Sequence, residues 1–198
     1  SEAINDVNIG KPIYALLAIP SVGRIGTGTE ADINNVRLGG ANHNTNDFAP
    51  VSDGGDITDI VLARGASVIR GGEGASNNAG DGFDGGSVGG VNVAECVVAM
   101  TIQGGRGGNS TGGGGTGGDG GLVERITIAG KFTDGNILLQ GGNAGNGNTT
   151  GSGGSGGGIS AASLNLLQID GNVTFTGGDG GDSGDTAGNG GLGGALGG

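Results

Sequence analysis

Three aspartates near the end of the sequence have the spacing best suited to binding a ligand. Asp179, Asp182 and Asp185 lie three residues apart in a glycine-rich segment. On an extended helix with three residues per turn they would share one edge, where carboxylate oxygens are ligands for a hard cation such as Ca²⁺. The same spacing also fits a solvated acidic edge, which we favour. We therefore expect no metal site and no cofactor, and calcium is the cation to test.

Two segments match half of the calcium-binding nonapeptide G-G-x-G-x-D-x-U-x, in which U is a large apolar residue. They lie at 114–119 and 177–182. Their U positions are Gly121 and Gly184, so the apolar anchor of the motif is missing. Such half-matches are expected by chance in a chain this rich in glycine.

The G-x-S-x-G pattern of a hydrolase nucleophile occurs at 85–89 and at 153–157. That nucleophile needs a strand-to-helix turn and a histidine base. Both matches lie in low-complexity sequence, and the single histidine, His43, lies among asparagines. Cys96, in the apolar run 91–100, fits a small buried side chain. We predict no catalytic residue and no enzyme activity.

Composition narrows the classes of protein further. Of 198 residues, 55 are glycine, and eight basic against nineteen acidic residues give a net charge of −11. The negative charge argues against nucleic acid and anionic membrane as partners. The single cysteine excludes a disulfide framework. No apolar run approaches the roughly 18 residues that a membrane span needs, so we expect no membrane insertion.

An apolar hexad of the form I-x-x-V-x-I recurs along the chain, and glycine follows it within three residues. Its last two apolar positions are two residues apart, which places them on one face of a β-strand. Ile and Val dominate these positions and favour strand over helix. The four copies are Ile4/Val7/Ile9, Ile33/Val36/Leu38, Ile57/Ile60/Leu62 and Val123/Ile126/Ile128.

A second short strand runs each time into a Gly-Gly pair, and a glycine-rich arm follows the pair. The strands are predicted at 67–70, 100–103, 137–140 and 173–176. The arms are predicted at 71–90, 104–121, 141–158 and 177–198. The pairs are spaced by 33, 37 and 36 residues, which indicates a repeat of that length.

The arms open in Gly-Gly-x triplets, a period that matches the threefold polyproline II helix. Such a helix has no internal backbone hydrogen bonds, so its amides and carbonyls must bond to neighbouring chains or to water. With two glycines per triplet, two of the three edges of the helix carry no side chains, so neighbouring chains can pack closely against them. A flexible Gly/Ser linker is the alternative. Four arms of similar length on equivalent strands favour ordered, mutually packed arms.

These units predict an all-β fold, a parallel β-solenoid of short strands with stacked polyglycine II-like arms. Residues 1–70 would form a strand-rich part with an inserted loop at about 41–56. Residues 71–198 would form the glycine-rich repeats and continue the same solenoid. The alternative is an antiparallel meander with long loops. The expected inward ladder contains Ile69, Ile102, Leu139 and Phe175.

The hexads and arms resemble those of glycine-rich parallel β-helix proteins of the secreted surface and adhesin type. The pattern I-x-x-V-x-I-x-G is similar to the rungs of pectin-lyase-like and surface-adhesin-like proteins. The arms look like the glycine-rich repeats of large bacterial and archaeal surface proteins, and like the polyglycine layers of phage tail-tip adhesins and glycine-rich antifreeze proteins. No catalytic residue carries over, because Asp56, Asp59 and Glu124 have no paired basic residues beside them.

We expect a non-enzymatic extracellular or cell-surface structural protein. Unpaired strands at the solenoid ends would meet head to tail, with copies of the chain as partners in a fibre or surface layer. The alternative is an adhesin or phage-type receptor-binding module whose polar arm tips contact surface glycans. Those tips are at 77–78, 109–111 and 148–150. Ice binding is a third possibility and would need a flat, regular face.

Overall fold

The computed structural model describes most of the chain beyond residue 52. The described residues are 53–58, 60–62, 68–94, 96, 99–130, 133–184 and 188–197, with four earlier strands at 7–9, 16–18, 25–27 and 35–38. For those four strands, and for 61–62 and 133–134, the structure describes the backbone and its pairing. Residues 41–52 of the predicted inserted loop lie outside the described residues.

The described chain is all-β, and its larger sheet has eight strands in the order β1-β3-β6-β9-β11-β8-β5, with β14 paired to β11. Strands β8 and β9 lie end to end along β11, and β5 and β6 pair with them in turn. The strands are β1 (Val7–Ile9), β3 (Ile25–Thr27), β5 (Ile57–Thr58), β6 (Ile60–Leu62), β8 (Val88–Gly89), β9 (Asn92–Val93), β11 (Val123–Gly130) and β14 (Ile159–Leu166).

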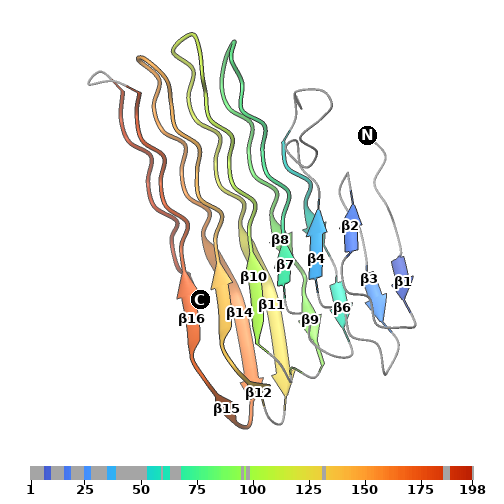
Figure 1. Ribbon diagram of the computed structural model, residues 1–198. Coiled ribbons are helices and arrows are strands. Elements are labelled where there is room, and N and C mark those ends of the chain that lie inside the picture. Colours follow the sequence, from blue (N-terminus) through green and yellow to red (C-terminus); the bar gives the residue numbers. More distant parts are fainter. Residues whose placement is uncertain are drawn as a thin grey trace.

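The second sheet has six strands in the order β16-β13-β10-β7-β4-β2. Its strands run opposite to those of the larger sheet (Figure 1). They are β2 (Leu16–Ala18), β4 (Asn35–Leu38), β7 (Val68–Arg70), β10 (Met100–Gln103), β13 (Ile137–Gln140) and β16 (Val173–Thr176). A separate short pair joins β12 (Thr133–Asp134) to β15 (Ile169–Asp170).

Neighbouring strands within each sheet are parallel and in register, and beyond residue 52 they lie one repeat apart. Ile102 pairs with Ile69 on one side and with Leu139 on the other, and Leu139 pairs with Phe175. The predicted pairing of the ladder is therefore confirmed, and Ile69, Ile102 and Leu139 are buried as predicted, whereas Phe175 is partly exposed. The antiparallel meander is wrong for the described strands, because all of their pairings are parallel.

One of the four hexads lies in a different sheet from the other three. The shared pattern predicts one sheet for all four. Val36, from the hexad Ile33/Val36/Leu38, pairs with Leu16 and Ile69 in the six-stranded sheet. A short apolar alternation fits either sheet because each sheet has one inward face. The sequence pattern alone therefore could not assign this hexad to a sheet.

Four strands of the larger sheet, β3, β8, β9 and β14, were not predicted from the hexads. Val88 and Ile159 occupy the same register position as Ile57 and Val123. Val88 begins an intact hexad, Val88/Val91/Val93, but Gly89 and Gly90 at its x positions make it look like the end of a glycine-rich arm. Ala162 stands at the central apolar position of the hexad that Ile159 begins, and this small residue hides the aliphatic spacing.

The core lies between the two sheets and is formed by their inward-facing side chains. Its members come from successive copies of both strands, so each copy is buried by its neighbours. Burying each isoleucine contributes about 1.5–3 kcal/mol. The core cluster is Ile57, Ile60, Ile69, Val88, Val91, Val93, Cys96, Met100, Ile102, Val123, Ile126, Ile128, Ile137, Leu139 and Ile159. Cys96 is buried, as predicted.

Each arm leaves the six-stranded sheet, turns at a tip and returns to the larger sheet (Figure 1). The outgoing layer contains 71–78, 104–111, 141–148 and 177–184, and the returning layer contains 53–56, 81–87, 115–122, 151–158 and 188–195. Within a layer, every third amide bonds to the next copy: the N–H groups of Gly71 and Gly74 donate to the carbonyls of Gln103 and Arg106. Residues 53–56, predicted as the end of a loop, follow the same rule, since Gly54 donates to Asp84.

A second set of amides joins the two layers. The N–H of Gly86 donates to the carbonyl of Gly72, that of Gly105 to Gly86, and that of Gly121 to Gly105. The row continues through Gly142, Gly157, Gly178 and Gly194. Glycine is required along it because a Cβ on Gly105 would lie 1.7 Å from the carbonyl oxygen of Gly72.

Candidate assembly interface

The two serines of the G-x-S-x-G matches lie in the returning layer. The N–H of Ser155 donates to Asp119 Oδ1 at 2.6 Å, and that of Ser87 donates to Asp56 Oδ1 at 2.7 Å. Each serine precedes a strand rather than a helix. His43 lies outside the described residues. In the structure, each serine therefore bonds through its backbone amide to an aspartate of the preceding copy.

The aspartates of the candidate cation edge are partly described. Asp179 and Asp182 lie on the last outgoing arm, and their N–H groups donate to the side chains of Asn143 and Asn146 at 3.1 and 3.0 Å. Asp185 lies outside the described residues. Among the residues that are described, no three His, Cys, Asp or Glu side chains are grouped to hold a metal ion. The half-matched nonapeptides lie in the arms.

Where the third residue of a triplet, the x residue, is Ser, Asn or Asp, its side chain can accept a hydrogen bond from the following copy. Asn109 N–H donates to Ser76 Oγ, Asn146 N–H to Asn109 Oδ1, and Asp182 N–H to Asn146 Oδ1. The distances are 3.2, 2.8 and 3.0 Å. A short side chain with an acceptor oxygen reaches the amide one copy further on. This geometry explains why Ser, Asn and Asp recur at these positions.

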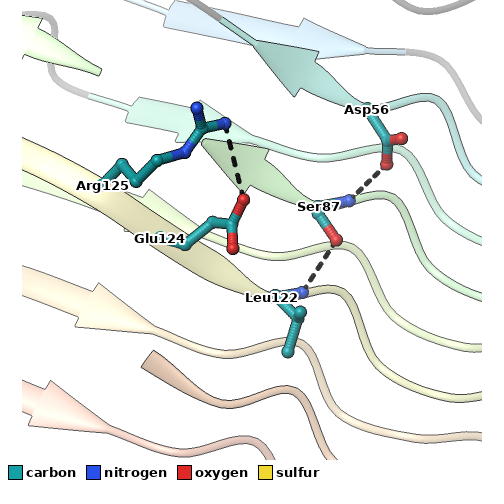
Figure 2. A network of polar contacts seen from close by, with 5 residues as sticks. All are labelled: Asp56, Ser87, Leu122, Glu124 and Arg125. Carbon is teal, nitrogen blue, oxygen red and sulfur yellow. Dashed lines mark hydrogen bonds and ion pairs between the residues drawn. The ribbon is translucent and has the colours of Figure 1, made fainter. Parts of the chain in front are cut away.

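In the returning layer the same ladder is acidic. Asp84 N–H donates to Asp53 Oδ1, Asp119 N–H to Asp84 Oδ1, and Ser155 N–H to Asp119 Oδ1. Figure 2 shows the neighbouring ladder, in which Asp56 accepts from Ser87, and Ser87 Oγ accepts from the amide of Leu122. The carboxylates are exposed, so water screens their mutual repulsion.

Two substitutions of Asp84 separate hydrogen bonding from charge. Asp84→Ala removes the acceptor for the Asp119 amide, and we expect it to lower the free energy of unfolding by at most about 1 kcal/mol. Asp84→Asn keeps an acceptor and removes the repulsion from Asp53 and Asp119, so its stability should equal or exceed that of the natural protein at low salt. Urea denaturation at low and high salt measures both. Equal losses in the two variants would contradict the assigned role of the ladder.

Among the described residues, the edge formed by β14, β16 and the last arm (177–184 and 188–194) has no further copy on its outer side, apart from the isolated parallel bridge between Ile159 of β14 and Leu196 (Figure 1). We call it the open edge. Val173 and Phe175 of β16 are 38% and 37% exposed, whereas Ile137 and Leu139 at the same positions of β13 are fully buried. Three further apolar side chains of this last copy are exposed: Leu167, Leu192 and Leu196. The open edge therefore presents unpaired backbone together with apolar surface.

The arm half of the open edge lacks the bonds that the preceding arm makes. The N–H groups of Gly141 and Gly156 donate to Thr176 and Leu192 in the next copy. Gly177 and Gly193 occupy the same positions in the last copy, and no later part of the described chain offers their amides an acceptor. Among the described residues, the amides of Gly177, Gly180, Gly190 and Gly193 in the last arm therefore have no acceptor in a further copy.

Sequence reasoning predicted unpaired strand edges in general and did not identify this surface. Leu192 stands at an x position where the other copies have Asp84, Asp119 and Ser155. An apolar residue at a position that is polar in the other copies was the only sequence feature that pointed to this surface. It could be found only after the arms were aligned.

Comparison with protein-family models, curated proteins and solved structures yields no match for this chain. The described residues contain no helix able to cross a membrane.

Proposed function

We propose that this chain is a non-enzymatic structural protein of an extracellular surface that assembles head to tail with copies of itself into a fibre or layer. In this proposal the chain is a parallel β-solenoid, and the arms are polyglycine II helices. The in-register parallel strands support the first point, and the bonding of every third amide to the next copy supports the second. The open edge is the observation that carries the assembly.

The contact joins the open edge of one copy to the β1–β2 edge of the next. In it, β16 pairs with β2 and β14 pairs with β1, so both sheets continue across the joint. Unpaired strand edges are templates for such pairing. A contact between two different surfaces does not close on itself by symmetry, so it generates an open fibre.

Substituting an exposed leucine on the edge tests the proposal. Leu196 is 59% exposed on the open edge, and Leu122 is 48% exposed away from it, so Leu196→Lys and Leu122→Lys add the same charge at different places. We expect filaments by electron microscopy and concentration-dependent sedimentation for the natural protein and for Leu122→Lys. Leu196→Lys should sediment as a monomer. A natural protein that stays monomeric at all concentrations would contradict the proposal.

An adhesin is the second candidate function. The arm tips gather at one end of the molecule (Figure 1), and they expose Asn78, Thr111 and Thr149. Polar side chains at that end are positioned to contact surface glycans. Glycan binding by a chain that forms no filaments would favour this function.

A further inference from the structure

We propose that a hollow on the outer face of the six-stranded sheet binds the carboxylate of a small organic acid that also carries a hydroxyl or ammonium group. The hollow lies where this sheet passes into the outgoing layer of the arms, and its volume is about 190 Å³. The site uses neither the open edge nor the arm tips, so it goes beyond the proposed function and does not depend on it. The hollow is lined by Arg70, Glu73, Gln103, Gly104, Arg106 and Asn143.

Three successive copies supply this lining. Arg70 and Gln103 are paired at the ends of β7 and β10. The residue before each of them is buried in the core, and successive side chains of a strand alternate in direction, so Arg70 and Gln103 face away from the core. Strands β4 and β16 flank these copies on either side, so the hollow lies within the sheet and not at its edge. The first x residues of the three arms complete it, and they are Glu73, Arg106 and Asn143.

The hollow gathers positive charge in an acidic protein. The chain has eight basic residues and a net charge of −11. Arg70 and Arg106 line the hollow, and Arg37 is paired with Arg70 in the neighbouring strand. Like charges at paired strand positions destabilise a sheet. Within the described part of the chain, neither Arg70 nor Arg106 forms an ion pair with an acidic side chain. A bound anion would therefore relieve the repulsion.

Hydrogen bonds fix the Arg70 guanidinium and leave part of it for a ligand. Its Nε donates to Gln103 Oε1 at 2.9 Å, and its Nη2 donates to the same oxygen. Gln103 Nε2 donates in turn to Gln140 Oε1 at 3.4 Å. The two N–H donors of Arg70 Nη1 take no part in this row. They remain to bind an anion.

The other polar side chains of the hollow supply further donors and one acidic acceptor. Asn143 Oδ1 accepts the amide of Asp179 at 3.1 Å, which leaves Asn143 Nδ2 as a donor. Arg106 supplies a second guanidinium, and its side chain is exposed. Glu73 supplies the single carboxylate of the lining. The hollow therefore offers donors to an anion and an acceptor to a donor group of the same ligand.

These groups select a class of ligand. Planar guanidinium groups bind a carboxylate through two parallel hydrogen bonds. The Glu73 carboxylate accepts a hydrogen bond from a hydroxyl or ammonium group, and its charge disfavours a ligand with a second negative charge. The volume is below the roughly 300–1,000 Å³ of sites for drug-sized ligands. A small hydroxy acid or amino acid fits both the charges and the size.

Ligand-observed saturation-transfer NMR with the full chain tests the site, because it detects weak binding whether or not the chain forms filaments. The probe is L-lactate, which has a carboxylate and a hydroxyl. Propionate lacks the hydroxyl, and lactamide lacks the charge. At constant ionic strength we expect saturable binding of lactate, with propionate about threefold and lactamide about tenfold weaker, since charge-assisted hydrogen bonds are the stronger ones. Lactamide binding as tightly as lactate, or no binding of lactate, would overturn the proposal.

Two substitutions locate the site by copying the residue that the next copy has at the same position. Arg70→Gln reproduces Gln103, and Arg106→Asn reproduces Asn143. Both variants should fold as the natural protein does, and Arg70→Gln should equal or exceed its stability in urea because a like charge is removed. Each should bind lactate about tenfold more weakly. Unchanged lactate binding in the folded variants would contradict the assigned lining.

Arg125→Gln is the matched control for charge. Arg125 is exposed on β11 of the other sheet and is not part of the lining, so this variant should bind lactate as the natural protein does. Equal weakening in Arg125→Gln and Arg70→Gln would mean that net charge alone controls binding, and the site would be refuted. Filament formation is measured separately, so filaments without lactate binding would refute this inference alone. Lactate binding without filaments would refute head-to-tail assembly alone.

Discussion

Replacing Gly156 with alanine is expected to lower the free energy of unfolding by about 1–3 kcal/mol, the usual cost of forcing extra atoms into a packed interior. The new Cβ would lie 2.0 Å from the carbonyl oxygen of Gly178, so one arm must move and break bonds between the layers. The matched change is Gly193→Ala, at the same position in the last arm. It should raise stability slightly, because alanine restricts the unfolded chain and finds open space in the folded one.

Thermal and urea denaturation of the two variants measure this difference. The opposite signs are the important result, since helix or strand propensity would affect both positions alike. Equal effects at Gly156 and Gly193 would mean that the layers do not pack backbone against backbone.

Replacing Ile102 with alanine is expected to cost about 2–5 kcal/mol, because it removes a fully buried side chain and leaves a cavity. Ile102 is in the middle of its ladder, between Ile69 and Leu139. Phe175→Ala at the end of the same ladder should cost less despite removing a larger side chain. Phe175 is 37% exposed, and one of its flanks has no neighbour.

Urea unfolding of both variants under monomeric conditions gives the comparison. Raising the concentration adds a second readout, since Phe175→Ala should also weaken assembly, whereas Ile102→Ala should not do so once its lower stability is allowed for. A larger loss at Phe175 than at Ile102 in the monomer would contradict the ladder.

The strands that could be predicted from the sequence are those with a clear aliphatic period. The Gly-Gly pairs fixed the register of β7, β10, β13 and β16, because each pair marks where a strand becomes an arm. The sheet assignment of Val36 could not be predicted, since alternating apolar residues fit either sheet. Strand β8 was missed because Gly89 and Gly90 make the hexad Val88/Val91/Val93 look like the end of a glycine-rich arm.

The polar ladders depend on positions that the sequence does not reveal singly. In the sequence, Asp119 is a single acidic residue in a glycine-rich segment. Its carboxylate meets the amide of Ser155 only because the copies are stacked. The open edge likewise required coordinates. Leu192 and Leu196 became informative when the structure placed them beside unused amides.

The central claim is that the glycine arms are held by backbone hydrogen bonds between stacked copies, and amide hydrogen exchange tests it most directly. In the monomeric Leu196→Lys variant, the amides of Gly105, Gly121 and Gly142 should be strongly protected, because each is bonded inside the double layer. The amides of Gly177 and Gly193 should exchange rapidly. Uniformly fast exchange along the arms, with protection confined to the strands, would contradict the account.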